Sequence, residues 1–321
     1  MISIVIPVYN GEAYICRCIE SLFASPNHES DLEVIAVNDG SRDRSSELLH
    51  ELADRYSSLR VIDQENSGAA QARKLGISLA AGDYIGFLDA DDWASADFYI
   101  SLEKKAKESQ ADIVVGNYTE EYPSRSQPQS NHFDEGQTFP LTPEEALRYL
   151  HCRRAVFPFP WNKLYRAEIL RSIDFPTGNF VGEDYLMQLQ LFEKATRIDF
   201  ADVNGYHYVL TENSASRSGY SASTLLAYNH FKEDFAYVSA RYPKQIPEAT
   251  HYLITEYLAC IIAMGRNKTY NKDMIREIKK FVRKGLGGFL GADYVPLRMK
   301  GSALAFAVSY RLLVTVYRIL A

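Results

Sequence analysis

The sequence predicts an α/β fold, in which a mostly parallel, Rossmann-like sheet has flanking helices and an all-helical C-terminal region follows it. Through the first part of the chain, short apolar runs alternate with segments of helical periodicity, as expected for right-handed βαβ units. After about residue 222 only the helical periodicity remains. We therefore divide the 321 residues into an α/β domain over 1–221 and a helical region over 222–321.

The elements of the α/β domain follow in chain order. Residues 2–6 form an apolar run that Pro7 ends, which predicts the first strand. Polar residues 38–41 stop the second strand, and Gly82 closes the helix that precedes the fourth. The predicted strands cover 2–6, 32–37, 59–62, 84–88 and 113–115, and the predicted helices cover 14–23, 45–56, 69–80 and 95–109.

The middle and the end of the chain complete the list of elements. Residues 120–136 are polar, which predicts an exposed loop that is either a lid over the sheet edge or a plain insertion. Thr142 precedes a proline and two acidic residues, a typical helix start. Further helices are predicted over 225–242, 247–264, 272–286 and 302–321.

The composition is that of a folded protein with reduced thiols. Hydrophobic residues make up 46% of the chain and charged residues 24%, which argues against disorder. Cys16 and Cys18 are too close for the usual zinc spacing, so we expect four reduced, mostly buried cysteines. Because no basic stretch precedes the first strand, we expect no signal peptide and a cytoplasmic protein.

The charge is unevenly placed along the chain. The net charge is −6, but the segment from Arg266 onward has 12 basic and 3 acidic residues. At helical spacing, the last segment has an apolar face and a basic face, and its two arginines make it a poor transmembrane span. Either this helix lies on an anionic membrane or it packs on its own protein. The apolar face is Phe306, Tyr310, Leu313, Tyr317 and Leu320, and the other is Lys300, Arg311, Thr315 and Arg318.

Polar clusters follow four of the predicted strands, at residues 7–11, 38–41, 64–68 and 89–92. Ligands of open parallel sheets bind at the carboxyl ends of the strands, so these clusters predict a site at one edge. Asp89 and Asp91 directly follow a buried strand and would repel each other unless a cation lies between them. Carboxylate oxygens suit Mg²⁺ or Mn²⁺, whereas the alternative for this pair is a solvated loop or helix cap.

These motifs resemble those of family 2 of the inverting glycosyltransferases. The resemblance covers roughly the first 220 residues, and the motifs have the order and spacing of that family. They are VIPVYN at 5–10, VNDGS at 37–41, NSG at 66–68 followed by Ala72 and Arg73, FLDADD at 87–92, WNKLY at 161–165 and GED at 182–184.

The resemblance implies a glycosyltransferase A fold that binds a nucleotide sugar, expected to be a UDP-sugar. Tyr9 would pack on the base, and Asp39 would accept from the uracil imino group. The donor-binding residues implied by similarity are Pro7, Tyr9, Asn10, Asp39, Gly68, Arg73, Asp89 and Trp161.

The resemblance also implies a metal site and a catalytic base. Asp91 would ligate Mn²⁺ or Mg²⁺, with Asp89 at the ion or its water shell and His207 as a further ligand or diphosphate contact. Asp184 would be the general base, and its neighbour Glu183 would raise the pKa of that base. The alternative for His207 is a strand histidine packed among tyrosines. The alternative for Glu183 and Asp184 is a pair of acids in the first turn of a helix.

One loop departs from the family pattern. Many relatives carry arginines in the loop after residues 206–208, where this chain has Val209 and Thr211. The Ser214–Ser216 pair does match the family, and Arg217 is a candidate replacement for the missing arginines. The sequence therefore leaves open which residues contact the phosphates on this side.

Other functions fit the sequence less well. An oxidoreductase would need a GxGxxG motif after the first strand, and a sugar nucleotidyltransferase would need a glycine-rich basic loop there. A non-catalytic nucleotide-sugar sensor would not need Asp91 and Asp184 together. The basic tail has no nucleic-acid-binding motif, so we expect no nucleic-acid partner. We expect a saccharide acceptor, polyprenyl-diphosphate-linked, in cell-surface polysaccharide synthesis, with the enzyme peripheral at the inner face of the membrane.

Overall fold

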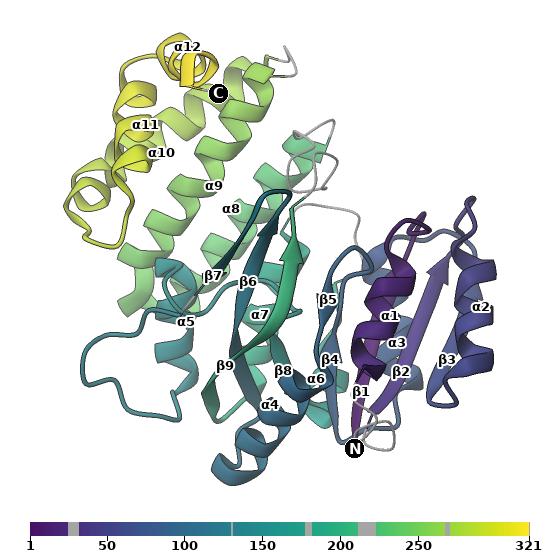
Figure 1. Cartoon of the computed structure of the whole chain (residues 1–321). Coiled ribbons are helices and arrows are strands. Elements are labelled where there is room, and N and C mark those ends of the chain that lie inside the picture. Colours follow the sequence, from purple (N-terminus) through teal and green to yellow (C-terminus); the bar gives the residue numbers. More distant parts are fainter. Residues whose placement is uncertain (25–31, 130, 177–181, 211–222, 267–269, 321) are drawn as a thin grey trace. The chain divides into compact units, whose positions relative to one another are not determined.

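A computed structural model describes the chain except residues 25–31, 130, 177–181, 211–222, 267–269 and 321 (Figure 1). The chain divides into two compact units. The α/β unit comprises Met1–Ala146, Pro158–Asn179 and Glu183–Thr211. The helical unit comprises Leu147–Phe157, Phe180–Gly182 and Glu212–Ala321. The boundary predicted at 221/222 lies outside the described residues, and the assignment of 147–157 to the helical unit is a finding that the sequence did not suggest.

The first half of the sheet is parallel, in the order β3–β2–β1–β4. These strands are β3 Leu59–Gln64, β2 Leu32–Asp39, β1 Ile2–Val8 and β4 Tyr84–Phe87. Residue Ile2 pairs with Leu32 on one side and with Tyr84 on the other, so the carboxyl ends of the strands meet at one edge. The strands β1 and β4 are buried along their whole length and match the sequence prediction.

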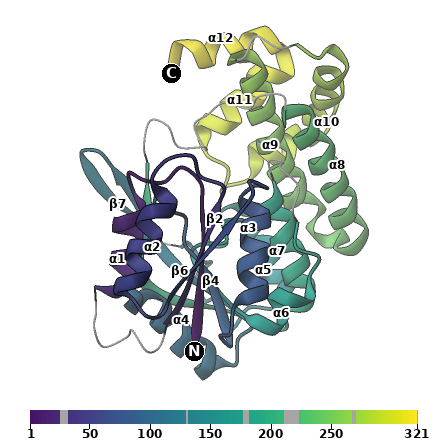
Figure 2. The same cartoon turned by 90° about the vertical axis from the view of Figure 1, so that its right-hand side faces the viewer.

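Helices cover both faces of this half-sheet. The helices α1 (Ile15–Phe23) and α2 (Ser45–Arg55) lie on one face, and α3 (Ala69–Leu79) lies on the other (Figure 2). A Cβ on Gly76 would lie 2.3 Å from Val5 Cγ1, so this glycine lets α3 approach β1 closely. The arrangement agrees with right-handed crossovers between the strands.

The second half of the sheet is mixed. Strand β8 (Lys163–Arg166) runs antiparallel between β4 and β6 (Ile113–Tyr122), and β9 (Ile198–Val209) is parallel to β6. The short β5 (Trp93–Ala94) pairs antiparallel with β9. Helices α4 (Ala96–Ser109), α6 (Ala167–Ser172) and α7 (Glu183–Lys194) join these strands. The predicted α/β fold is thus confirmed, with antiparallel strands in its second half.

The prediction of a loop over residues 120–136 was wrong in its first part. Strand β6 continues to Tyr122 and forms a hairpin with β7 (Arg125–Gln129). Strand β7 is mostly exposed and contains Pro128, so polar residues occupy both faces of an edge strand and hide its periodicity. Helix α5 (Pro143–Cys152) does begin as predicted: Thr142 Oγ1 accepts from the backbone N–H of Glu145, and the Glu145 carboxylate accepts from Thr142.

The helical unit contains the long helices α8 (Ser223–Arg241), α9 (Ile246–Arg266) and α10 (Lys272–Gly291), where the sequence predicts helices. Its core includes Phe231, Leu258, Ile278, Phe289 and Phe306. All four cysteines of the chain are free thiols, and three are buried, as expected. Within the described part of the chain, no helix has both the length and the hydropathy that crossing a membrane requires.

The prediction of a single helix over residues 302–321 was wrong. Two helices, α11 (Leu297–Val308) and α12 (Tyr310–Leu320), are separated by Ser309 in an extended conformation. Phe306 and Leu313 of the predicted membrane face are fully buried in the core of the helical unit, and Tyr310 packs against it. These three residues therefore pack on the protein itself, which was the alternative to membrane contact, while the side chain of Leu320 lies outside the described residues.

Candidate active site

The loops after β1 and β2 hold each other in place. Pro7 is buried in β1, whereas the Tyr9 side chain beyond it is 49% exposed. Asn10 has a positive φ of 51°, and its backbone N–H donates to Ser41 Oγ at 3.0 Å. The Asn10 side-chain oxygen accepts from the backbone N–H of Arg42 at 2.9 Å. The β1 loop is thereby fixed, and the aromatic ring of Tyr9 remains accessible for stacking.

Asp39 at the end of β2 is a buried cap for helix α3. Its Oδ1 accepts from the backbone N–H of Ser67 at 2.8 Å and from Gln64 Nε2 at 2.6 Å. Its Oδ2 accepts from the backbone N–H of Gly68 at 2.8 Å. Gly68 has a φ of 95°, which favours glycine at this turn. The carboxylate thus stabilises the N-terminus of α3, and both of its oxygens already have partners within the protein.

Arg73 of α3 links two of the predicted acidic groups. It is buried, and one terminal nitrogen lies 2.7 Å from Asp89 Oδ1. Burial lowers the pKa of this guanidinium, but Asp89, Asp184 and Glu183 raise it by more, so that the pKa lies above its ordinary value. Arg73 therefore lies in the field of both the strand-end acids and the acids at the start of α7, which brings these predicted residues into one electrostatic group.

In the acidic cluster after β4, burial and neighbouring carboxylates raise the pKa of Asp91 and of Asp92. Burial raises the pKa of Asp91, and the nearby Asp89 raises it further, while Arg17 lowers it. Arg17 also donates to the Asp91 backbone oxygen at 2.8 Å. A divalent cation at the Asp91 carboxylate would relieve this repulsion, so the pair fits the expected metal.

Asp92 is a structural residue that the sequence reasoning did not assign. It is fully buried, and its Oδ2 accepts from the Tyr206 hydroxyl at 2.6 Å. Its Oδ1 accepts from the backbone N–H of Val209 at 2.7 Å. Burial, Asp89 and Asp91 raise the pKa of Asp92 well above its usual range. The Asp92 side chain anchors the end of β9 beside the acidic cluster. In the sequence, the only indication of this role was a second aspartate directly after Asp91.

His207 on β9 lies near the acidic cluster through the β5–β9 pairing, which places it opposite Trp93, two residues after Asp91. The His207 ring stacks on Trp93 with centroids 3.4 Å apart, and its Nδ1 lies 2.7 Å from Glu121 Oε1. A carboxylate on one ring nitrogen is the usual support of a histidine whose other nitrogen binds a metal. Glu121 was not singled out in the sequence.

The side chains of the described residues do not form a complete metal cage. In the described ranges, no group of three or more His, Cys, Asp and Glu side chains is placed to hold an ion by itself. Mg²⁺ in nucleotide sites is usually held by one or two carboxylates together with substrate phosphates. Asp91, supported by His207, is consistent with such a partial ligand set.

Glu183 and Asp184 begin helix α7, directly after Gly182. Burial raises the pKa of Asp184, as does Asp89, while Arg73 and Lys163 lower it, and the net shift is upward. Burial and the Asp184 charge raise the pKa of Glu183 to about 7. Both acids therefore have a raised pKa, but for Asp184 the causes are burial and Asp89, whereas the sequence analysis attributed the expected rise to Glu183.

Lys163 is a further group near this base that the sequence did not assign a role. Its side chain is fully buried at the start of β8, and Nζ donates to the Phe159 backbone oxygen at 2.6 Å and to Asn162 Oδ1 at 2.8 Å. Burial lowers the pKa of Lys163 to about 7, although Asp184 raises it.

Trp161 lies in a stack of aromatic rings. Its ring stacks on Phe159 at 4.9 Å, on Tyr206 at 4.4 Å and on Tyr208 at 5.5 Å between centroids. The Trp161 side chain is buried, so it supports the wall of the site through these neighbours more than it offers an open platform. Thr211, which stands where relatives carry an arginine, lies outside the described residues, as do the Ser214–Ser216 pair and Arg217.

Comparisons with known proteins show which family this chain resembles. Residues 3–174 match the sequence model of "Glycosyl transferase family 2". The chain is 35% identical over 224 residues to the glycosyltransferase EpsJ of Bacillus subtilis, a match that covers 68% of this chain and 64% of EpsJ, less than two thirds of that relative.

Two solved structures are similar over almost the whole chain. S. aureus TarS 1–349 in complex with UDP-GlcNAc has a TM-score of 0.60 at 20% identity, covering 99% of this chain and 91% of TarS. The mannosyltransferase PcManGT of Pyrobaculum calidifontis, in complex with GDP-Man and Mn²⁺, has a TM-score of 0.54 at 16% identity, covering 98% and 83%.

The sheet order, the acidic edge and these likenesses define a glycosyltransferase with the glycosyltransferase A fold. Within that class, the chain belongs to glycosyl transferase family 2.

Proposed function

We propose that this glycosyltransferase moves a hexose or an N-acetylhexosamine from a UDP-sugar to a hydroxyl group of a saccharide acceptor, with inversion at the anomeric carbon. The observation that carries the proposal is the electrostatic group in which Arg73 lies in the field of both the strand-end Asp89 and the α7 acid Asp184. The acids after β4 suit a cation that binds the donor diphosphate, and the acids at the start of α7 suit a general base.

The donor is proposed to lie along the carboxyl edge of the parallel strands. The exposed Tyr9 ring would stack on the uracil, and the loop after β1 would hold the nucleotide. Asp39 would act through the N-terminus of α3, whose position it fixes. Arg73 would help to hold the uridine, and Asp89, which pairs with Arg73, would contact the ribose. The UDP-GlcNAc bound by TarS supports a uridine nucleotide.

Asp91 and His207 are proposed to hold Mn²⁺ or Mg²⁺ together with the diphosphate, with Asp89 at the ion or its water shell. Such an ion neutralises the charge that develops on the leaving diphosphate. The raised pKa of Asp91 and the Glu121 contact of His207 support this assignment. The Mn²⁺ bound by PcManGT agrees with it.

Asp184 is proposed as the general base. It would take the proton of the acceptor hydroxyl while that oxygen forms a bond to the anomeric carbon and the bond from this carbon to the diphosphate breaks. Arg73 and Lys163 would keep enough of Asp184 ionised near neutral pH, and burial would make it basic enough to accept the proton. A single displacement of this kind gives the inverted anomer.

The acceptor is proposed to be a polyprenyl-diphosphate-linked saccharide in cell-surface polysaccharide synthesis. The enzyme would then work in the cytoplasm as a peripheral protein at the inner face of the membrane. The basic segment from Arg266 onward supports an anionic surface as its neighbour.

Calorimetric titration with UDP tests the donor site. We expect wild type to bind UDP much more tightly with Mn²⁺ than without it, and Asp91→Asn to lose this difference. Asp54→Asn, an exposed position on α2 that removes the same charge, is the matched control and should behave as wild type. Equal UDP binding with and without Mn²⁺ would contradict the metal assignment, and no UDP binding at all would contradict the uridine assignment.

A further inference from the structure

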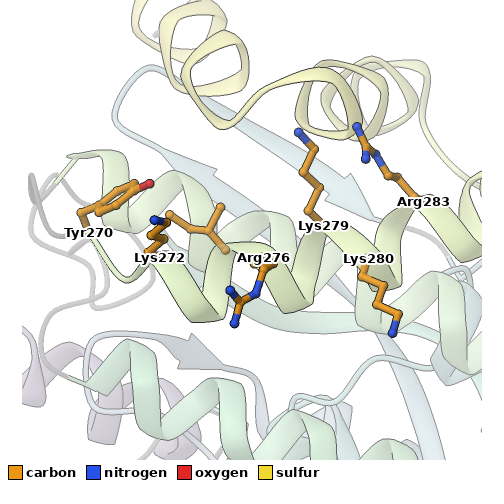
Figure 3. Close-up of a pocket in the computed structure, with 7 residues that line it drawn as sticks. Tyr270, Lys272, Arg276, Lys279, Lys280 and Arg283 are labelled. Atoms are coloured by element: carbon orange, nitrogen blue, oxygen red, sulfur yellow. The ribbon is translucent and has the colours of Figure 1, made fainter.

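Helix α10 presents a cationic surface. Its side chains line an open depression of about 510 Å³ within the helical unit, drawn in Figure 3. The spacing of the basic residues places them on one side of three successive turns, over about 16 Å of helix. The cations that line the depression are Lys272, Arg276, Lys279, Lys280 and Arg283, with Tyr270 at one end.

Most of this charge is not balanced within the helix. Helix α10 has six basic residues against Asp273 and Glu277. Asp273 pairs with Arg276 at the exposed surface, whereas Glu277 accepts from Tyr228 and pairs with Lys232, away from the depression. The helix therefore keeps a positive excess on the side that forms the depression.

An exposed apolar face of α11 adjoins these cations. Leu297 is 85% exposed, Leu304 46% and Val308 67%, and their spacing of seven and four residues puts them on one side of the helix. The opposite side of α11, with Ala303 and Phe306, is buried in the core. The buried side of α11 already packs in the core. Internal packing therefore does not explain why three large apolar side chains are exposed together on its other side.

Hydrogen bonds join the two features. Lys279 Nζ donates to the backbone oxygen of Val308 at 2.7 Å, and Arg283 Nε donates to that of Ala307 at 2.9 Å. Figure 3 shows both side chains extending from α10 toward the neighbouring helical segment. These bonds join the last turn of α11 to α10, so that the backbone of Val308 lies next to Lys279.

We propose that these two elements form one docking surface for an anionic lipid bilayer, with the α10 cations at the phosphate headgroups and the α11 side chains Leu297, Leu304 and Val308 at the acyl boundary. We call it the α10–α11 surface. Interfacial membrane binding combines these two components, a basic side and an exposed apolar side. A soluble polyanion accounts for the cations but leaves the apolar face unexplained.

This inference deepens the proposed function, because it rests on a membrane-linked acceptor and names the surface that would meet the membrane. It also moves that surface. The sequence left open whether the face with Phe306, Tyr310 and Leu313 contacts a membrane or the protein. These three residues belong to the core or pack against it, and the opposite side of α11 is the exposed one.

Vesicle flotation of the full chain tests the cationic component. We expect binding to phosphatidylcholine vesicles that contain phosphatidylglycerol and little binding to pure phosphatidylcholine, with weakening at high salt. Replacing Lys272, Arg276 and Lys280 together with Gln should weaken binding by about 100-fold, because each cation contributes about fivefold at such a surface. Lys279 and Arg283 are left in place because they cap α11.

A control variant with the same change of net charge separates a local effect from a general one. Replacing the exposed Arg60, Lys104 and Lys244 with Gln should leave flotation within about threefold of wild type. If this control loses binding as strongly as the α10 variant, the surface is not where we place it, and the proposal fails.

A second pair of variants tests the apolar component. Leu304→Gln with Val308→Gln should weaken the binding that remains at high salt, whereas Ile246→Gln, at another exposed apolar position of the helical unit, should not. Equal flotation of the first variant and wild type would overturn the role of α11.

Two further outcomes overturn the proposal while leaving the proposed function intact. One is tight binding of soluble polyphosphate without any flotation, which would assign the depression to a soluble polyanion. The other is equal flotation with neutral and anionic vesicles. The same variants should bind UDP as tightly as wild type does. If wild type itself does not bind UDP, that result contradicts the proposed function and says nothing about this surface.

Discussion

Asp39→Asn is predicted to destabilise the α/β unit through helix α3. Asparagine keeps one oxygen, so its amide nitrogen must face either the N–H of Gly68 or the donors on the Ser67 side, and one side loses its acceptor. A hydrogen bond to a charged group contributes about 1.5–3 kcal/mol, and a buried donor without an acceptor costs about 1–3 kcal/mol. Together with the lost charge at the helix N-terminus, we expect the free energy of unfolding to fall by about 2–4 kcal/mol.

Tryptophan fluorescence during urea denaturation measures this change. The chain has two tryptophans, Trp93 and Trp161, and both belong to the α/β unit, so the signal reports on that unit. Glu65→Gln, an exposed position nearby, is the control and should change stability by less than about 0.5 kcal/mol. An Asp39→Asn protein that is as stable as wild type but fails to bind UDP would refute the capping role and favour direct contact with the uracil.

Three further predictions address pH, the helical core and the metal loop. Burial raises the pKa of Asp184, so this base is protonated at a higher pH than an ordinary aspartate. A pH–rate profile should therefore show the transfer rate falling with decreasing pH at a pH above the ordinary aspartate pKa of about 4, and levelling off at higher pH. A rate that stays constant down to a pH near 4 would exclude such a base. Phe306→Ala should lower the stability of the helical unit by about 3–5 kcal/mol in urea denaturation followed by circular dichroism, whereas Leu304→Ala on the exposed side should change it by less than about 1 kcal/mol; equal effects would contradict the packing of α11. Tyr206→Phe removes the hydroxyl that donates to the buried Asp92 and should lower stability by about 1–3 kcal/mol in the fluorescence assay, and an unchanged stability would show that Asp92 does not anchor β9.

The parallel half of the fold was predictable because its signals are local. The strands β1 and β4 are continuous apolar runs, and polar clusters follow them at the carboxyl edge. The hairpin of β6 and β7 was missed because both sides of an exposed edge strand are polar, so the sequence has no alternation to detect. The break at Ser309 was missed because serine is no strong helix breaker and the apolar spacing continues beyond it.

The site shows the same division between local and long-range signals. The sequence motifs identified Asp91, Arg73 and Asp184 as site residues. They could not show that Arg73 interacts electrostatically with both Asp89 and Asp184. The contact of Glu121 with His207 joins positions 86 residues apart, so no spacing rule reveals it. Asp39 was expected at the uracil, and its partners at Ser67 and Gly68 appear only when β2 and the start of α3 are folded together.

The measurement that tests the central claim most directly compares wild type with Asp184→Asn. Release of UDP from a panel of UDP-hexoses and UDP-N-acetylhexosamines is followed in the presence of Mn²⁺ and a bacterial lipid extract as acceptor, and UDP binding is measured calorimetrically on both proteins. We predict that wild type releases UDP from at least one donor and that Asp184→Asn binds UDP normally but transfers about 10²- to 10⁴-fold more slowly. Transfer by Asp184→Asn at close to the wild-type rate would contradict the assignment of the base and the account of the site built on it.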